Sequence, residues 1–278
     1  MAKLTWLPKK TFELEFEVPW SEVKKTYDHV LGHFAEEVKI KGFRKGKAPK
    51  DLVEKSVDKA DVYGEVVNHL LPKTYAEAVN EHKLRPAISP KITIVAAKEN
   101  EAWKFKATAC ELPEMKLGNY QPAVKGALAK DKIVVPGKPE LTQTQKLNLI
   151  SRALLETVSV DLPDLMIQAE TDRLLSRLLD QIQKLGLTID QYASSNQKTV
   201  DQLKIEYRQT AINSLTLELI LSAIGDEKKF AAKVEDIDKM IAASGDEKLK
   251  KRLNTPSERA YIASVLRKRQ VIDYLLAL

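Results

Sequence analysis

A short basic segment is the part of the sequence whose residue types best suit binding chemistry. Residues 39–50, Lys-Ile-Lys-Gly-Phe-Arg-Lys-Gly-Lys-Ala-Pro-Lys, hold six basic side chains and no acidic one. Lysine and arginine offer charge and hydrogen bonds to phosphate, and Phe43 between them can stack or enter an apolar socket. Gly42 and Gly46 free the backbone to turn. The composition fits an RNA or ribonucleoprotein surface, and it equally fits a solvated basic loop.

The same segment does not fit a nucleotide site. A phosphate-binding P-loop needs four residues between its first glycine and its Gly-Lys pair, and then a Ser or Thr that ligates magnesium. Only three residues separate Gly42 from Gly46, and Ala48 follows Lys47. We therefore expect no bound nucleotide.

The histidines give little support for metal or catalytic chemistry. His29 and His33 are four residues apart, as in some helical metal sites, but the apolar face of their helix leaves both beside it, and Cys110 is the only thiol. We expect these two to be surface histidines. His69 and His82 come with no G-x-S-x-G serine and no cysteine signature, so the sequence predicts no catalytic residue, metal or cofactor.

The elements around the basic segment follow from hydrophobic periodicity. Residues 11–18 alternate strictly between apolar and polar, as a half-buried strand does. Further strands are expected at 4–7, 92–95 and 103–109, and helices at about 21–42 with Ser21 as N-cap, from Pro49, and at 61–83. Residues 1–112 are thus predicted to form an α+β domain, an antiparallel sheet with a helical insert that carries the basic loop between two helices.

The rest of the chain divides into a connector and a helical region. Residues 113–145 hold Pro and Gly with little periodicity, and predict a connector with one short strand at 132–135. Residues 146–278 predict an all-α domain with helices that begin at Pro163, Thr188, Thr199 and Thr255 and end at glycines such as Gly186 and Gly225. Its leucine-rich faces either bury one another or stay partly open as a surface for partners.

Composition limits the class of protein. The net charge is +6, and the helical part from residue 151 onward is neutral, with 19 basic and 19 acidic side chains. No apolar run reaches the length of a membrane span, the N-terminus lacks the apolar core of a signal peptide, and one cysteine allows no internal disulfide. We expect a cytoplasmic protein with no membrane partner.

Residues 38–49, Val-Lys-Ile-Lys-Gly-Phe-Arg-Lys-Gly-Lys-Ala-Pro, resemble the ribosome-docking signature of the trigger factor family, the bacterial ribosome-associated chaperones. The signature follows an amphipathic helix that itself follows an alternating strand, as it does here. Residues 158–163, Val-Ser-Val-Asp-Leu-Pro, and the helix after them are similar to the start of that family's helical C-terminal domain. The resemblance covers 1–112 strongly and about 145–278 more loosely.

The resemblance implies a fold and a set of site residues. It implies a ribosome-binding domain at 1–112 and a substrate-binding domain with helical arms at 146–278. Docking would rest on charge contacts from Arg44, Lys45 and Lys47 to RNA and to a ribosomal protein, and on an apolar anchor at Phe43, with Gly42 and Gly46 giving backbone freedom.

The middle of the chain departs from the family pattern. Family members carry a prolyl isomerase domain of roughly 90 residues or more with an aromatic-lined pocket, whereas residues 113–145 are short and contain one aromatic, Tyr120. We therefore expect a short form that lacks the isomerase and is not an enzyme.

Two functions are compatible with these features. The first is an ATP-independent holdase that docks on the large ribosomal subunit near the exit tunnel, shields apolar segments of nascent or unfolded chains, and self-associates weakly. The alternative is an RNA-binding or ribosome-assembly factor whose helical region is a dimerisation bundle. The neutral charge of the helical region counts against that alternative.

Overall fold

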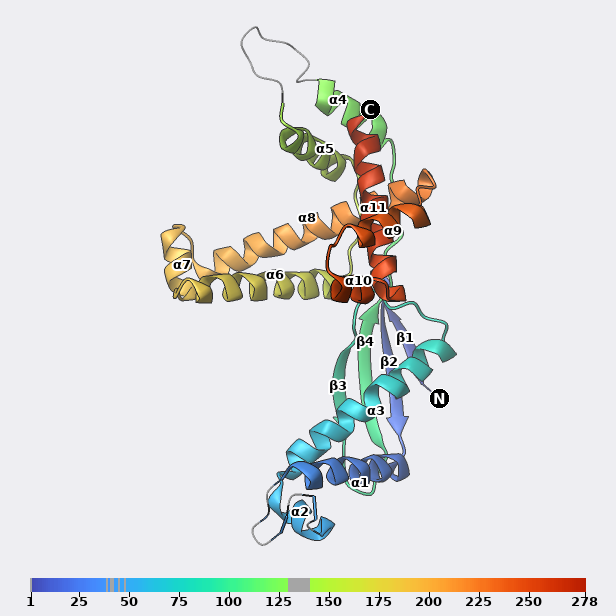
Figure 1. Ribbon diagram of the computed structural model, residues 1–278, viewed down its shortest axis with the longest axis vertical. Coiled ribbons are helices and arrows are strands. Elements are labelled where there is room, and N and C mark those ends of the chain that lie inside the picture. The colour runs from blue at the N-terminus through green and yellow to red at the C-terminus, as the bar shows by residue number, and fades with distance from the viewer. Residues whose placement is uncertain (1, 39, 41–42, 45, 48, 130–140) are drawn as a thin grey trace. The chain divides into compact units, whose positions relative to one another are not determined.

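The computed structural model describes residues 2–38, 40, 43–44, 46–47, 49–129 and 141–278 (Figure 1). The chain divides into two compact units, Met1–Leu112 and Pro113–Leu278. The expected fold class, an antiparallel sheet with a helical insert followed by an all-α part, is confirmed. Within the described residues, no helix has both the length and the apolar character needed to cross a membrane.

Four antiparallel strands form the sheet of the first unit, in the order β1-β2-β4-β3. Their bounds are β1 Lys3–Leu7, β2 Thr11–Val18, β3 Lys91–Ala96 and β4 Trp103–Cys110. The predicted alternation of β2 is confirmed, because Phe12, Leu14, Phe16 and Val18 are all buried. The opposite face of the sheet is polar, and there Lys106 donates a 3.1 Å hydrogen bond to Glu13 across the β2–β4 pair.

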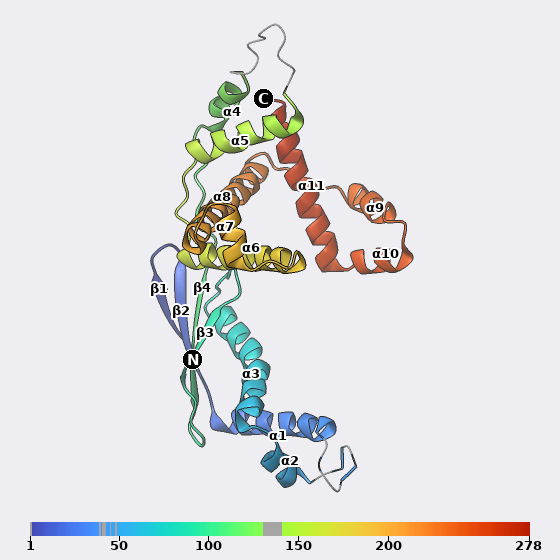
Figure 2. The same ribbon diagram turned by 90° about the vertical axis from the view of Figure 1, so that its left-hand side faces the viewer.

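Three helices are inserted between β2 and β3. They are α1 Trp20–Glu37, α2 Lys50–Ser56 and α3 Lys59–Glu81. Figure 2 shows α3 running along one face of the sheet with α1 crossing it, and the two helices pack on each other. Buried valines from both helices complete the core over the sheet: Val23, Val30, Val62 and Val66.

The first two helices begin and end differently from the sequence prediction. Pro19, and not Ser21, is the N-cap of α1, and Pro49 is the N-cap of α2 and not its first helical residue. An N-cap takes a non-helical ψ, and both prolines combine their fixed φ with an extended ψ of 145° and 141°. The first helix ends at Glu37 because Val38 is extended, and Gly42, its predicted end, lies outside the described residues.

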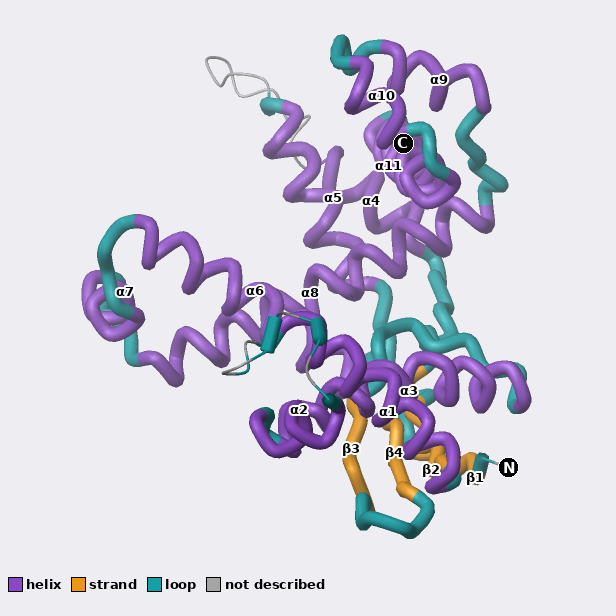
Figure 3. Tube along the Cα trace, turned by 60° about the horizontal axis from the view of Figure 1, so that its bottom comes forward, coloured by secondary structure: helices purple, strands orange, loops and turns teal. Residues whose placement is uncertain are grey.

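The described part of the second unit consists of helices. They are α4 Tyr120–Ala129, α5 Gln143–Thr157, α6 Asp164–Lys184, α7 Ile189–Ser195, α8 Val200–Glu227, α9 Val234–Ala242, α10 Glu247–Leu253 and α11 Pro256–Leu276. A shared core joins α4, α5, α8 and α11, while α6 and α8 pair along their length with α7 at the turn between them (Figures 1 and 3). The capping boxes predicted at Thr188 and Thr199 are both present, and Thr255 accepts a hydrogen bond from the Glu258 N–H.

Three details of this unit differ from expectation. Helix α4 lies in the predicted connector, and its Tyr120 and Val124 are buried against α5. Pro163 is the N-cap of α6 and precedes its first turn. Gly225 does not end α8 but lies within it, where a Cβ atom would be 2.8 Å from Nε of Arg267 on α11, so its role is close packing.

Two predictions for this part of the chain are not tested. The short strand predicted at 132–135 lies outside the described residues, and the division into 1–112, 113–145 and 146–278 stays a prediction.

Candidate functional site

The basic loop between α1 and α2 presents its described side chains to solvent. The Phe43 side chain is 44% exposed, although phenylalanine is normally buried, and Arg44 and Lys47 are exposed as well. Two local bonds shape the loop, from the Phe43 N–H to Ile40 O (3.1 Å) and from the Lys47 N–H to Arg44 O (2.9 Å). Gly46 has a φ of +78°, which only glycine adopts without strain.

Of the six residues predicted for docking, the structure therefore places four together on one exposed loop: Phe43, Arg44, Gly46 and Lys47. Gly42 and Lys45 lie outside the described residues. Among the described residues, no acidic side chain lies within ion-pair distance of Arg44 or Lys47, so both charges are available to an anionic partner.

The two helices that flank the loop are joined by side-chain contacts. The Tyr27 hydroxyl on α1 donates a 2.9 Å hydrogen bond to Glu54 Oε1 on α2, and Val53 of α2 is fully buried. Lys50, the first residue of α2, reaches Asp28 O of α1 at 3.5 Å. This junction fixes α2 against α1.

A chain of aromatic contacts connects that junction to the sheet. The Tyr27 and Tyr63 ring centroids are 5.2 Å apart, and Tyr63 lies 5.4 Å from Trp103 on β4 in an edge-on arrangement. The Tyr63 hydroxyl donates a 2.7 Å hydrogen bond to Glu99, which also pairs with Lys59 at 3.5 Å. The two helices that flank the loop, α1 and α2, are therefore connected through side-chain contacts to the core of the first unit.

In this series of aromatic contacts, the two tyrosines are neutral phenols that lie beside carboxylates. Burial and the hydrogen bond to Glu54 raise the pKa of Tyr27 to about 12. Burial, followed by the hydrogen bond to Glu99, also raises the pKa of Tyr63. The same Tyr63 bond and the Lys59 charge lower the pKa of Glu99, so the carboxylate is ionised at neutral pH. Sequence reasoning missed these residues, because contact between separate helices leaves no local signal.

The helical unit exposes apolar side chains at the α7 end of the paired helices. Leu185 and Leu187, on either side of the turn after α6, are 72% and 39% exposed, and Ile205 near the start of α8 is 69% exposed. We call Leu185, Leu187 and Ile205 the hairpin tip. Helices α6 and α8 pair through apolar side chains that include the buried Leu178 and Ile182. The residues of the hairpin tip are not needed for this pairing and stay exposed as apolar surface.

A second group of exposed apolar side chains lies on α9 and α11. Its members are Val234, Met240, Tyr261 and Val265. A cavity of about 440 Å³ opens between α8 and α11 and is lined by residues that include Leu221, Phe230 and Ala263. A cavity with such a lining can accept apolar groups.

Metal binding has no comparable support. Within the described residues, no set of three or more His, Cys, Asp or Glu side chains is arranged to hold a metal ion.

Two matches to a known protein family together cover residues 2–277 of the chain. The family described as Bacterial trigger factor protein (TF) matches residues 2–147, and its C-terminus matches residues 137–277. The two matches overlap at residues 137–147.

Two curated relatives are similar to the N-terminal part. The chain is 41% identical over 114 residues to Trigger factor of Carboxydothermus hydrogenoformans, and 39% identical over 119 residues to Trigger factor of Moorella thermoacetica. These alignments span 41% and 43% of this chain but only 27% of each relative. The chain thus matches about a quarter of the length of these relatives.

A solved structure shares the fold. It is a trigger factor chaperone studied for promiscuous substrate recognition in folding and assembly activities, and it matches with a TM-score of 0.60 over 100% of this chain and 99% of that one. At 12% sequence identity, this match concerns the fold alone.

Proposed function

The chain belongs to the trigger factor family, and from that premise we propose that it is an ATP-independent chaperone that docks on the ribosome and holds apolar segments of nascent or unfolded chains. The observation that carries the proposal is the hairpin tip. Three large apolar side chains stay exposed there on a well-packed helical pair. Burying them on a client would gain roughly 25 cal/mol per Å² of apolar surface, without any covalent chemistry.

The docking part of the proposal rests on the loop at Phe43. Its exposed Arg44 and Lys47 suit RNA phosphates or an acidic patch on a ribosomal protein, and Phe43 suits an apolar socket beside them. Gly42, Lys45 and Gly46 complete the proposed docking residues. The same proposal, with its ribosome partner near the exit tunnel, implies a cytoplasmic location.

We propose no enzymatic activity for this chain. Tyr120, the single aromatic side chain of residues 113–145, is buried among α4, α5, α8 and α11 and does not line an open pocket. The adjoining family matches also leave no intervening stretch for an isomerase domain.

The hairpin tip offers a direct test by suppression of client aggregation without ATP. Replacing Leu185, Leu187 and Ile205 together by serine should raise the concentration of protein that halves the aggregation of an unfolded client. The matched control replaces the same three residues by methionine, which keeps the surface apolar, and should stay close to wild type.

Circular dichroism would verify that both variants keep the helical fold. Equal suppression by the serine variant and by wild type, with folding intact, would contradict the assignment of the tip as a client surface. Equal loss in the serine and methionine variants would point to a structural role for these positions instead.

A further inference from the structure

Strand β3 lies at an open edge of the sheet. In the order β1-β2-β4-β3 it pairs with β4 on one side, and among the described residues no strand pairs with its other side (Figure 1). Pairing with β4 is regular from Lys91 to Ile94, and the register shifts between Ile94 and Ala96. Alternate residues of an edge strand point their N–H and C=O groups away from the sheet. The edge can therefore pair with a further strand.

The inner face of the sheet is incompletely covered beside this edge. Ile94 lies opposite Phe105, and residues directly opposite each other on paired strands share a face of the sheet. Phe105 is buried in the core, so Ile94 faces inward as well. The Ile94 side chain is nevertheless 51% exposed, and it lines a cavity of about 460 Å³ between β3 and α3.

One side of α3 forms the opposite wall of this cavity. Its lining residues Ala60, Tyr63, Gly64 and Val67 are three or four positions apart in neighbouring pairs, so they lie on one face of the helix. Two of them are small. A Cβ atom at Gly64 would meet no heavy atom of the described residues within 4 Å. The cavity therefore has room for a side chain that this part of the chain does not supply.

The lining suits an apolar group. It is completed by residues of α3, of β3 and β4, and of the turn between these strands: Asn68, Ile94, Ala97, Glu99 and Trp103. Among the described lining residues only Glu99 carries a charge, and it is engaged by the Tyr63 hydroxyl at 2.7 Å and by Lys59 at 3.5 Å. An apolar group that enters the cavity therefore meets no unpaired charge.

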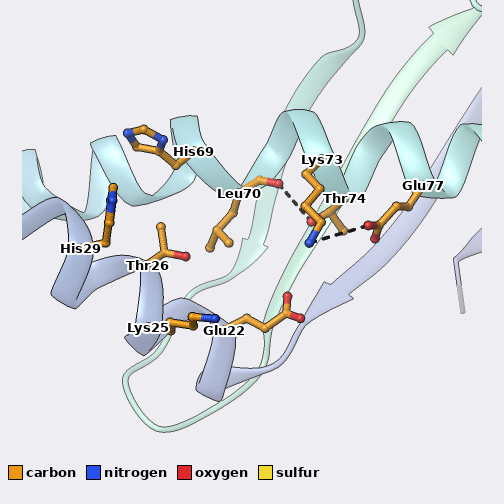
Figure 4. A pocket seen from close by; sticks show the side chains of 9 residues that line it. All are labelled: Glu22, Lys25, Thr26, His29, His69, Leu70, Lys73, Thr74 and Glu77. Carbon is orange, nitrogen blue, oxygen red and sulfur yellow. Dashed lines mark hydrogen bonds and ion pairs between the residues drawn. The ribbon is translucent and has the colours of Figure 1, made fainter.

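The cavity between α1 and α3 has the opposite character. It measures about 350 Å³, and Figure 4 shows charged side chains from both helices around it, among them Lys25, Lys73 and Glu77. The Lys73 Nζ lies 3.9 Å from Glu77 Oε1. An apolar group there would remove water from several charges, which is unfavourable. The cavity beside β3 is the better apolar site.

We propose that an extended segment of polypeptide pairs with the open edge of β3 and inserts one large apolar side chain into the cavity, against Val67 and Trp103. The identification of this segment as part of an unfolded client rests on the function proposed above. Main-chain hydrogen bonds to the edge accept many sequences, whereas the cavity selects a large apolar side chain.

Binding of a short fluorescein-labelled peptide to the full chain tests the site. In this peptide valine and threonine alternate on both sides of one central phenylalanine, and fluorescence anisotropy measures its affinity. Gly64→Leu should fill the cavity and weaken binding by about tenfold or more, because burial of one phenylalanine side chain contributes at least that factor. The melting temperature should not fall, since leucine favours a helix more than glycine does.

Gly32→Leu is the matched control. Gly32 also lies within a helix of the first unit, where a Cβ atom would meet no heavy atom of the described residues within 4 Å, and it does not line the cavity. This variant should bind the peptide like wild type. No binding by wild type, wild-type affinity in Gly64→Leu, or equal weakening in the two variants would overturn the site.

N-methylated peptides test the strand pairing itself. A strand joins a sheet edge through alternate N–H groups, so methylation of one alternating set of residues should abolish binding and methylation of the other set should preserve it. Full binding by both methylated peptides would overturn the pairing.

Other occupants and the proposed function are separated by two further measurements. Loss of self-association in Gly64→Leu without peptide would assign the edge to a second copy of the chain and overturn the peptide proposal. The serine variant of the hairpin tip should bind the peptide like wild type. A chain that binds the peptide but suppresses no client aggregation would keep the β3 site and overturn only the proposed function.

Discussion

The hydroxyl of Tyr27 on α1 donates a 2.9 Å hydrogen bond to Glu54 on α2, and this bond ties together the two helices that carry the ends of the basic loop. A loop whose flanking helices are fixed to each other has fewer conformations to lose when it binds a partner. We therefore expect the placement of Phe43 and Arg44 at the proposed docking surface to depend on the hydrogen bond between Tyr27 and Glu54.

Replacing Tyr27 by phenylalanine should remove this hydrogen bond while keeping the ring against Tyr63. The expected cost is about 1 kcal/mol of unfolding free energy, because a part-buried hydrogen bond to a carboxylate is lost. We also expect weaker ribosome binding, measured by co-sedimentation, because the loop becomes less ordered. Chemical denaturation measures the first effect.

Glu54→Gln and the double variant complete a cycle for this pair. Non-additive losses would show that Tyr27 and Glu54 act through each other. Tyr261→Phe on α11 serves as the control, since that side chain is 65% exposed, and it should leave both stability and ribosome binding unchanged. Wild-type binding by Tyr27→Phe would contradict the positioning role.

The sheet was predictable from the sequence because its signal is local. The alternation in β2 repeats every second residue, and Pro8, Lys9 and Lys10 form the turn that returns β1 to it. Helix α4 was missed because Pro122 and Gly126 are helix breakers in general. Pro122 is tolerated because it lies in the first turn, where no backbone N–H is needed within the helix.

The contacts around the candidate sites were not predictable in the same way. Tyr27 and Glu54, or His29 and His69, meet only because α1 packs against α2 and α3, and one sequence carries no record of which helix faces which. Exposure is a tertiary property as well. Leu178 in α6 and Leu185 just after it are the same residue type seven positions apart, yet Leu185 is 72% exposed and Leu178 is buried.

Alanine at Phe43, Arg44 and Lys47 together should abolish co-sedimentation with ribosomes and leave the fold intact. These exposed side chains contribute little to the core, so the melting temperature should hardly change. Binding by wild type should also weaken with salt, but modestly, because few charges take part.

Alanine at Lys248 and Lys251 on α10 is the charge-matched control, since it also removes two positive charges, and it should leave ribosome binding in place. Unchanged co-sedimentation of the loop variant would contradict the docking assignment. A steep salt dependence, worth many phosphate contacts, would favour the RNA-binding alternative.

Cys110 should make the protein less stable in alkaline solution. Burial raises the pKa of its thiol from 9.0 to about 11. The unfolded chain therefore releases the thiol proton at a lower pH than the folded chain. The contribution of Cys110 to the unfolding free energy is constant below pH 9 and falls as the pH rises from 9 to about 11. Over that window wild type should lose about 2–3 kcal/mol more than Cys110→Ala, measured by denaturation at several pH values. Parallel curves for the two proteins would rule out this contribution.

Prolyl isomerisation by the purified chain should not exceed the uncatalysed rate. Catalysis on a free peptide needs an open apolar pocket that holds the twisted proline, and Tyr120 is only 2% exposed within the helical core. A coupled assay with a proline-containing peptide measures this directly, with an isomerase of the FK506-binding type as the positive control. Clear turnover that persists after further purification would refute the proposal that this short form is not an enzyme.

We expect the first unit to carry the ribosome-docking activity and the second unit to carry the client-holding activity. The core cluster around Phe12, Val62 and Phe105 contains only residues of the first unit, so a fragment of residues 1–112 should fold alone and still bind ribosomes. That fragment lacks the hairpin tip and should lose most of the suppression of client aggregation. Full-length protein without a client should cover its apolar surface by weak self-association, seen as a concentration-dependent sedimentation coefficient. Full aggregation suppression by residues 1–112 alone would show that the helical unit is not the client surface, and would strengthen the alternative in which it serves as a dimerisation bundle.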